Sequence, residues 1–294
     1  MSVPTIFDRK SYAARRLRQR PSFLAADVGE NLAMRLSAIN RRFGDALDLH
    51  SRDQVFAMIG RDAARWTRTT LHPAGPGDVA ADEEMLPFAP ACFDLVVSTL
   101  SLHAVNDLPG ALTQIRKVMR PDGLFLAALF GGETLRELRT AFARGESEIL
   151  SGVSPRVAPF ADIRELGALL QRAGFALPVA DSEKTVVRYG AFPTLVEDLR
   201  ALGETNVLAG RAAGFLRRDV MASMLAAYAD ENPDGPFSAT FEIIYLTAWA
   251  PHESQPKPLR PGSARVSLAT AVGMPPGRAD RRDNESPPGG GGGT

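Results

Sequence analysis

The sequence predicts an α/β fold, a doubly wound and mostly parallel sheet with helices on both faces. Nearly continuous apolar runs, such as residues 93–98 and 124–130, are typical of strands buried on both faces. Segments with helical periodicity alternate with these runs, and capping and turn residues separate them. This alternation implies right-handed crossovers and a ligand site at the carboxyl ends of the strands.

The composition fits one α/β domain with additions. The chain has 294 residues, of which 45% are hydrophobic, enough for a full-sized core. Its 34 basic and 34 acidic side chains give a formal net charge of zero, so the overall charge predicts no nucleic-acid partner.

The single cysteine and the hydropathy pattern indicate the cellular compartment and the expected relation to membranes. Cys92 can form no disulfide within the chain, which indicates a reducing environment. We therefore expect a cytoplasmic protein, or a mitochondrial-matrix protein if the source is eukaryotic. No apolar run approaches the roughly 20 residues of a membrane helix, so we expect no transmembrane segment, while peripheral contact with a membrane is compatible with the sequence.

Residues 1–44 are predicted to form an N-terminal arm and helix. An arginine cluster at 15–20 has only Tyr12 nearby for base stacking, and it favours a solvated helix start over a nucleic-acid-binding arm. Apolar residues at near-helical spacing then predict one long amphipathic helix: Phe23, Val28, Leu32, Leu36, Ile39 and Phe43.

Residues 45–192 are predicted to form the core of the fold. Asp107 and Pro109 open one helix, and Asp162 with Glu165 forms a capping box that opens another, which Gly174 closes. The expected elements are a strand at 46–49, a helix at 55–63, a strand near Trp66, a strand at 93–98, a turn at 120–123, a strand at 124–130, a helix at 163–173, and strands at 178–180 and 185–189.

The remaining residues are predicted to form a helical insertion, the last strand of the sheet and a disordered tail. Residues 193–236 are predicted to be a helical insertion that lies over the edge of the sheet, and residues 237–250 the closing strand. Residues 251–294 are rich in Pro, Gly, Ser and charge, so we expect a disordered tail.

Two strand ends carry acidic residues that could meet a ligand. Asp48 lies in the first strand and His50 follows it, where nucleotide-binding folds place glycines that let the backbone approach a ligand. No glycine appears between Asp48 and Gly60, so an ordinary strand-to-helix loop is an equal alternative. Asp82 and Glu83 follow the third strand, where a carboxylate can accept from an exocyclic amine, although acidic turns are common.

A third candidate segment follows the strand at 93–98 and contains Ser98, Leu100 and His103. His103 has the chemistry of a general base, although a packed or capping histidine is the more frequent use of such a residue. Asp94 enters the same strand at its other end, and we expect its carboxylate to accept backbone or side-chain donors in a structural role.

Other chemistries match the sequence poorly. Four histidines and one cysteine never cluster at metal-ligand spacing, so no metal site is predicted. There is no phosphate loop of the Gly-x-x-x-x-Gly-Lys type and no Gly-x-Ser-x-Gly elbow. The residues therefore identify no catalytic group by themselves.

Several stretches together resemble one family closely. They are residues 82–88 (Asp-Glu-Glu-Met-Leu-Pro-Phe), 93–103 (Phe-Asp-Leu-Val-Val-Ser-Thr-Leu-Ser-Leu-His) and 105–109 (Val-Asn-Asp-Leu-Pro), with further matches at 6–9, 120–123, 130–135, 154–157, 174–175 and 249–255. The chain resembles the methyltransferase-like assembly factors of respiratory complex I, in the protein arginine hydroxylase branch. It is more distantly similar to the malonyl carrier-protein methyltransferases of the biotin pathway. The resemblance covers about residues 5–255.

The resemblance implies a seven-stranded, Rossmann-like class I methyltransferase sheet with an N-terminal helix, a helical insertion before the last strand, and S-adenosylmethionine as the cofactor. The cofactor-binding residues that it implies are Asp48 and His50 on the loop after strand one, Asp82 and Glu83 at the adenine, and Ser98 and Leu100 on the floor.

The chain departs from the family pattern at two places. Relatives read Leu-Asp-Leu/Ile-Gly-Cys-Gly at strand one, where this chain has His50, Ser51 and Arg52. Relatives also carry an acid after strand two for the cofactor ribose, and residues 66–71 contain none. A side chain where the family has bare backbone would intrude on the methionine moiety, so these changes weaken the expectation of a cofactor.

Three functions follow as hypotheses. The first is a protein of the complex I assembly family of the S-adenosylmethionine-dependent methyltransferase type. The second is a protein arginine hydroxylase that acts on a respiratory-chain subunit. The third is a non-catalytic assembly chaperone that grips a client through residues 193–230. All three imply a protein client and no nucleic acid, and fold alone does not choose between them.

Overall fold

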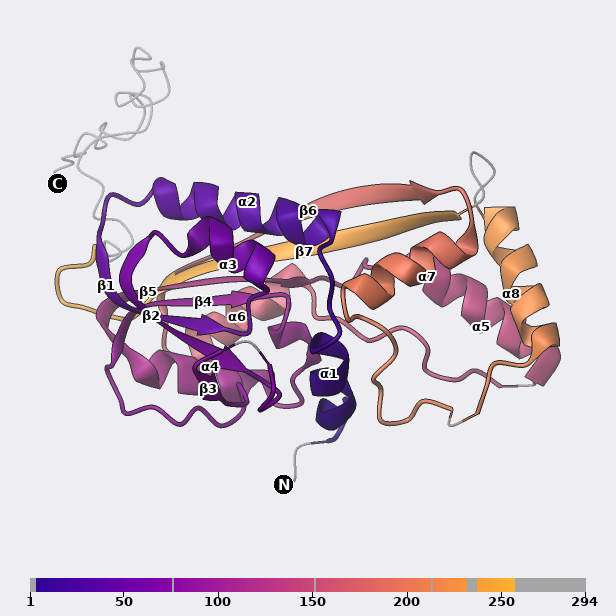
Figure 1. The fold of residues 1–294 in the computed structure, drawn as a ribbon, viewed down its shortest axis with the longest axis horizontal. Helices are drawn as coiled ribbons and strands as arrows, with labels where there is room; N and C mark the ends of the chain where they lie inside the picture. Colours follow the sequence, from indigo (N-terminus) through magenta and orange to yellow (C-terminus); the bar gives the residue numbers. More distant parts are fainter. Residues whose placement is uncertain (1–3, 76, 151, 213, 232–236, 257–294) are drawn as a thin grey trace, which may run out of the picture. The chain divides into compact units, whose positions relative to one another are not determined.

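The computed structural model describes residues 4–75, 77–150, 152–212, 214–231 and 237–256 (Figure 1). Residues Met1–Glu253 form one compact unit. Most of the predicted tail, from residue 257, lies outside the described residues. In the part of the chain that the structure describes, no helix is long and apolar enough to cross a membrane.

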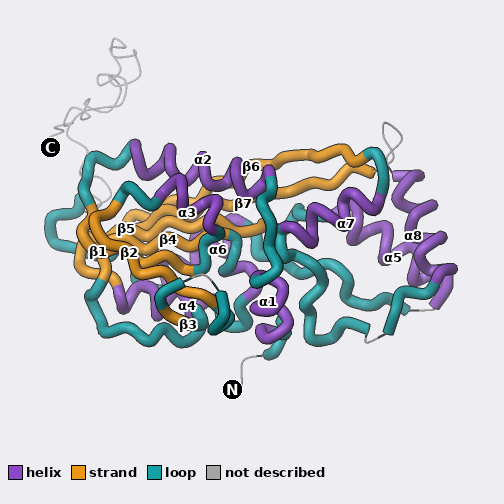
Figure 2. The backbone as a smooth tube through the Cα atoms, viewed as in Figure 1, coloured by secondary structure: helices purple, strands orange, loops and turns teal. Residues whose placement is uncertain are grey.

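A seven-stranded sheet in the order β3-β2-β1-β4-β5-β7-β6 forms the centre of the unit (Figures 1 and 2). The first five strands are parallel, and β7 runs antiparallel to β5 and β6. The doubly wound, mostly parallel sheet is therefore confirmed. The order reverses between β1 and β4, which opens a crevice at their carboxyl ends. The strands are β1 (Phe43–Leu49), β2 (Ala63–Thr70), β3 (Val79–Ala80), β4 (Phe93–Thr99), β5 (Met119–Phe130), β6 (Ala176–Tyr189) and β7 (Phe237–Trp249).

Helices cover both faces of the sheet. α2 and α3 pack in one hydrophobic core on one face, and α4 and α6 pack in a second core on the other. The helices are α1 (Arg9–Arg16), α2 (Phe23–Ser37), α3 (Asp53–Ile59), α4 (Leu108–Val118), α5 (Arg136–Leu150), α6 (Ile163–Arg172), α7 (Phe192–Ala201) and α8 (Arg218–Glu231), with a short 3-10 helix η1 (Leu102–Ala104).

The predicted helix starts are confirmed. The Asp107 carboxylate accepts from the Gly110 amide at the start of α4. Asp162 and Glu165 form the expected capping box of α6, and Gly174 takes a φ of +83° just after it. These caps satisfy backbone groups that a helix end leaves without partners.

Three boundaries differ from the sequence-based expectation. α2 ends at Ser37, and Phe43 opens β1 because its ring is buried in the same core as the helix. The predicted turn at 120–123 lies inside β5, where Asp122 takes a φ of +60° and bonds to Ala250 beside β7. The two short strands expected within 178–189 are one strand, β6, whose polar middle is tolerated at a sheet edge.

α5, α7 and α8 gather beside the far parts of β6 and β7 (Figures 1 and 2). α5 was not predicted. The helices expected at 193–230 are α7 and α8, with a long connection between them. α8 packs closely on α5 at Gly145, where an added Cβ would lie 2.6 Å from the backbone nitrogen of Met224. Residues of all three helices line one mostly apolar pocket.

Candidate functional site

Asp48 anchors the loop after β1. Its buried carboxylate accepts from the Ser51 amide at 3.1 Å and meets Nε of Arg68 at 3.1 Å. Burial raises the pKa of Asp48, although Ser51 and Arg68 oppose that rise. The acid of the first strand thus forms a salt bridge with an arginine of β2.

His50 stands where the family has its first loop glycine. It takes a φ of +62°, the left-handed conformation that favours glycine. Its side chain is only 2% exposed, with Nδ1 3.3 Å from the Thr69 hydroxyl and Nε2 3.3 Å from Oε2 of Glu83. His50 therefore keeps the backbone conformation of a glycine turn, but its imidazole ring fills the space beside the turn.

Glu83 is the buried centre of the acidic loop. Its carboxylate meets His50, accepts from the Ser101 hydroxyl and pairs with Arg9 of α1. Burial raises its pKa, but His50 and Arg9 outweigh that effect and hold the pKa well below the ordinary value. Asp82, with a side chain 36% exposed, binds the same Arg9 at 2.8 Å. Both predicted adenine contacts thus hold the N-terminal helix.

Arg16 of α1 bridges the carboxyl ends of β1 and β4. Its guanidinium donates to the Leu100 carbonyl at 2.6 Å, and to the carbonyl of His50. It also donates to the Tyr12 hydroxyl at 3.2 Å. These two carbonyls flank the strand-order switch, where ligands of this fold class usually lie. A cation of the protein itself occupies that position.

Arg52, at the second glycine position of the family, is buried as well. Its guanidinium donates to the Leu202 carbonyl, and its Nε has no hydrogen-bond partner among the described residues. Burial, together with the nearby Arg16, lowers its pKa to about 10. Ser98, expected on the cofactor floor, is buried with its hydroxyl also unpartnered there.

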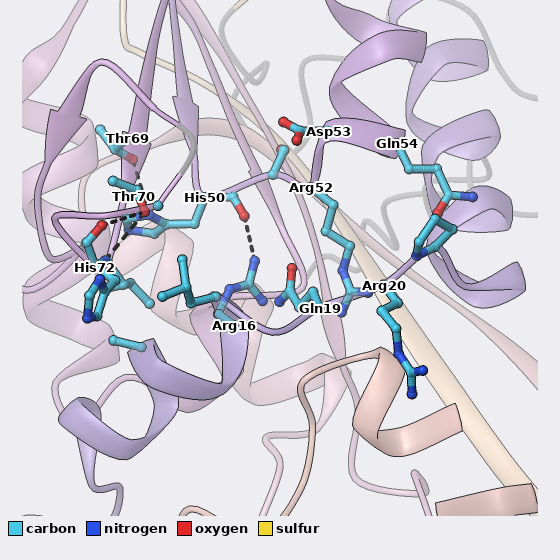
Figure 3. A pocket seen from close by; sticks show the side chains of 16 residues that line it. Arg16, Gln19, Arg20, His50, Arg52, Asp53, Gln54, Thr69, Thr70 and His72 are labelled. Carbon is cyan, nitrogen blue, oxygen red and sulfur yellow. Dashed lines mark hydrogen bonds between the residues drawn. The ribbon is translucent and has the colours of Figure 1, made fainter. Parts of the chain in front are cut away.

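A cavity of about 310 Å³ remains between α1, the loop after β1 and the end of β2. Figure 3 shows Arg16, Gln19 and Arg52 among its lining residues. Among the described residues that line it, Asp53 is the only acid, and its carboxylate already pairs with Arg68 at 2.9 Å. The charged side chains of this crevice cavity are therefore mostly cationic, and apolar residues complete its wall.

A second, mostly apolar pocket of about 270 Å³ lies beyond η1, against α5 and α7. Phe130 and Phe160 line it and contact the ring of His103 edge-on, with centroids 4.8 and 5.6 Å away. Nε2 of His103 lies 3.0 Å from Oε2 of Glu204, which also lines the pocket. We call this the aromatic pocket.

The carboxylate of Glu204 is held in its ionised form. Burial raises its pKa, but His103 and the arginines Arg16 and Arg52 outweigh burial, and the pKa lies below the ordinary value. Glu204 was not found from the sequence, because it lies in the connection after α7 and belongs to no motif. His103 was predicted as a candidate base, and the structure places it in this pocket rather than in the crevice.

Five of the six residues predicted to bind the cofactor gather at the crevice: Asp48, His50, Glu83, Ser98 and Leu100. Asp82 lies at its outer rim. Asp94, expected to be structural, accepts from the amides of Gly44 and Asp45 at 2.9 and 3.0 Å, and that expectation is confirmed. Within the described residues, no group of three or more His, Cys, Asp or Glu side chains could hold a metal ion.

Comparison with known proteins gives the family. A methyltransferase domain family matches residues 36–127. The mitochondrial arginine hydroxylase NDUFAF5 of Homo sapiens is 40% identical over 300 residues, a match that covers 93% of this chain and 86% of that protein. The chain belongs to the NDUFAF5 family. NDUFAF5 of Danio rerio is also 40% identical, over 263 residues, covering 84% of this chain and 81% of that protein. The family predicted from the motifs is thus confirmed.

More distant relatives agree with the fold. A malonyl-[acyl-carrier protein] O-methyltransferase of Laribacter hongkongensis is 39% identical over 181 residues, covering 62% of this chain and 59% of that protein. Among solved structures, a Bacillus subtilis protein, YcgJ, matches with a TM-score of 0.51 at 13% identity, over 76% of this chain and 99% of that one. A putative methyltransferase from Bacillus halodurans matches with a TM-score of 0.50, also at 13% identity, over 76% of this chain and 98% of that one. This NDUFAF5-family chain therefore has the methyltransferase fold.

The crevice residues do not fit S-adenosylmethionine as they lie in the structure. That cofactor carries an ammonium and a sulfonium cation, but the acids at the crevice are each paired within the protein. The ring of His50 fills the space between Thr69 and Glu83, and Arg16 already occupies the carbonyls of His50 and Leu100.

Proposed function

We propose that this NDUFAF5-family protein recognises an arginine side chain of a respiratory-chain subunit in the aromatic pocket. The observation that carries the proposal is the ionised carboxylate of Glu204, 11% exposed and beside His103, at one end of a pocket walled by phenylalanine rings. The names of the NDUFAF5 relatives, which are arginine hydroxylases, support the choice of arginine.

An arginine side chain matches the pocket in both of its parts. Its methylene stem packs against apolar walls, and its planar guanidinium stacks on aromatic rings such as Phe130 and Phe160. A carboxylate such as Glu204 accepts two parallel N–H groups from a guanidinium, whereas it meets lysine only as a point charge. The pocket should therefore distinguish arginine from lysine.

His103 offers a second acceptor. A carboxylate can only accept, so Glu204 fixes Nε2 of the imidazole as the donor of their 3.0 Å bond. Nδ1 is then an acceptor, and it is buried without a partner among the described residues. In this proposal Glu204 positions the ring of His103, and Nδ1 of the neutral imidazole accepts a hydrogen bond from a guanidinium N–H of the client.

Methyl transfer from S-adenosylmethionine is the weaker alternative, because the crevice side chains would have to move before that cofactor could enter. The same filled crevice favours a second candidate, an assembly chaperone that holds the client arginine without altering it. We also propose that the client is a respiratory-chain subunit and that the protein acts in the cytoplasm, or in the mitochondrial matrix if the source is eukaryotic.

NMR titration of the full chain with N-acetylarginine amide tests recognition. We expect the ring resonances of His103 and Phe160 to shift, with weaker shifts for the lysine analogue and for the neutral citrulline analogue. Glu204→Gln should weaken binding by about tenfold, the equivalent of roughly 1.4 kcal/mol, and Glu197→Gln, on the exposed face of α7, should leave it unchanged. Equal shifts for arginine and citrulline would refute the proposal.

Mass spectrometry of an arginine peptide incubated with the protein, molecular oxygen and a two-electron reductant separates the two candidates, because one oxygen atom would enter a C–H bond of the arginine and the other would leave as water. Gain of one oxygen atom on the arginine would indicate a hydroxylase. Recovery of the unmodified peptide from a saturable complex would indicate a chaperone.

A further inference from the structure

The crevice cavity holds more buried positive charge than the protein compensates. Arg16 and Arg52 are both buried there, at 9% and 7% exposure. Within the described residues, the only carboxylate within 4.0 Å of Arg16 is that of Glu204, at 3.8 Å, and none lies so close to Arg52. Glu204 also serves His103 in the aromatic pocket. One carboxylate is thus shared by Arg16 and His103, and Arg52 has no carboxylate partner among the described residues.

Two side chains that line the cavity carry buried hydrogen-bond donors without partners among the described residues. The Nε atom of Arg52 and the amide nitrogen of Gln19 are buried without partners among the described residues. Both side chains line the cavity with Arg16, and Figure 3 shows the three near one another. Buried donors without partners are rare, and each one costs free energy unless a ligand or water satisfies it.

We propose that this crevice binds a small oxyanion, a phosphate monoester or a carboxylate, through Arg16, Gln19 and Arg52, at the place where the fold would otherwise hold an adenosyl cofactor. Guanidinium groups bind phosphate and carboxylate oxygens through paired N–H donors. The cavity of about 310 Å³ is at the small end of ligand pockets, which leaves room for a small anion.

The two sites are coupled through Glu204. An anion in the crevice offsets the charge of Arg16 and Arg52, so Glu204 becomes free to accept a client guanidinium. Each ligand should then strengthen the other, because coupling between two binding sites is reciprocal. This consequence distinguishes a ligand site from an adventitious cluster of cations.

Calorimetry of the full chain with inorganic phosphate tests the proposal, with sodium chloride of equal ionic strength as the control for screening. We expect saturable phosphate binding and a rise in melting temperature that chloride does not give. Titrations with ribose 5-phosphate and with acetate identify the preferred oxyanion. S-adenosylmethionine should bind no better than acetate. A lack of any anion effect beyond that of chloride, or tight binding of S-adenosylmethionine, would overturn the proposal.

Gln19→Glu is the sharpest variant, because it places a carboxylate beside the unpaired arginine. We expect the variant without phosphate to melt at a higher temperature than the native chain, and its phosphate response to vanish. Gln171→Glu, the same change on the exposed surface of α6, should alter neither property. Arg52→Lys should keep a weakened phosphate response that Arg52→Gln loses. Equal phosphate responses in Gln19→Glu and Gln171→Glu would contradict the site.

Discussion

His50 and Glu83 form a buried pair across the crevice, with Nε2 of the imidazole 3.3 Å from Oε2 of the carboxylate. The first residue lies on the loop after β1 and the second on the loop after β3. The φ of +62° at His50 shows that the glycine-type turn has survived the loss of its glycine. The pair therefore replaces ligand contacts by contacts within the protein.

Glu83→Gln should destabilise the protein in a pH-dependent way. The folded-state pKa of Glu83 is lowered below its ordinary value of 4.5, so its contribution is fully present above that pH and is lost as the pH falls toward the lowered pKa. At neutral pH the variant should lose about 1.5–3 kcal/mol, the scale of hydrogen bonds to a charged group. Urea unfolding of both proteins at neutral pH and at about pH 3 measures the difference.

The difference between native protein and Glu83→Gln should narrow in acid. Glu197→Gln, at an exposed carboxylate of α7, should show no such trend. A difference that is constant across this pH range would show that Glu83 acts by packing alone.

Asp94→Asn should lower stability by about 1.5–3 kcal/mol, because it weakens two charge-assisted bonds from the amides of Gly44 and Asp45. Phosphate and arginine-amide binding should be unchanged once the variant is folded, since Asp94 lies at the end of β4 away from the crevice. Chemical unfolding and the two titrations check this order of effects. A larger loss of affinity than of stability would be inconsistent with a structural role.

Gly145→Ala should destabilise the contact between α5 and α8. The new methyl group would lie 2.6 Å from the backbone nitrogen of Met224, which no side-chain adjustment can relieve. We expect a loss of about 1–3 kcal/mol, the usual cost of overpacking a close contact, measured by thermal unfolding. Gly167→Ala in α6, where an added Cβ meets nothing within 4 Å, is the control and should not lower stability.

Phosphate should strengthen arginine recognition. With inorganic phosphate bound, the affinity for N-acetylarginine amide should rise by about fivefold, the lower end of measured coupling between sites. In Glu204→Gln the enhancement should disappear, because the shared carboxylate is lost. NMR titrations with and without phosphate supply the four affinities, and independent binding in the native chain would contradict the coupling.

The alternation of strands and helices along most of the chain and two of the helix starts were predictable from local signals. Asp107 and Asp162 cap helices because an aspartate followed by proline or by glutamate three residues later satisfies free amides within a few residues. The family motifs around residues 82–103 likewise predicted where the crevice would lie. The end of α2 was misjudged at Phe43, because an apolar residue suits a helix face and a buried strand equally well.

The side-chain contacts within the site could not be predicted, because they join residues that are far apart in the sequence. Arg16 reaches Leu100 across 84 residues, and Glu204 meets His103 across 101. No periodicity or motif reports such pairs, so the sequence indicates only a solvated helix start at the arginine cluster. This prediction is wrong for Arg16, which is buried at the end of α1, whereas Arg18 and Arg20 are exposed.

The occupation of the crevice by His50, Glu83 and Arg16 is tested most directly by calorimetric titration of the native chain with S-adenosylmethionine. Displacing these side chains would break the buried pair and the bonds to two carbonyls, so we expect no heat of binding even at about 1 mM ligand, where a complex of only about −4 kcal/mol would be detected. Saturable one-to-one binding at micromolar concentration would contradict the claim that the protein's own side chains fill the crevice. It would instead favour a function as an S-adenosylmethionine-dependent methyltransferase.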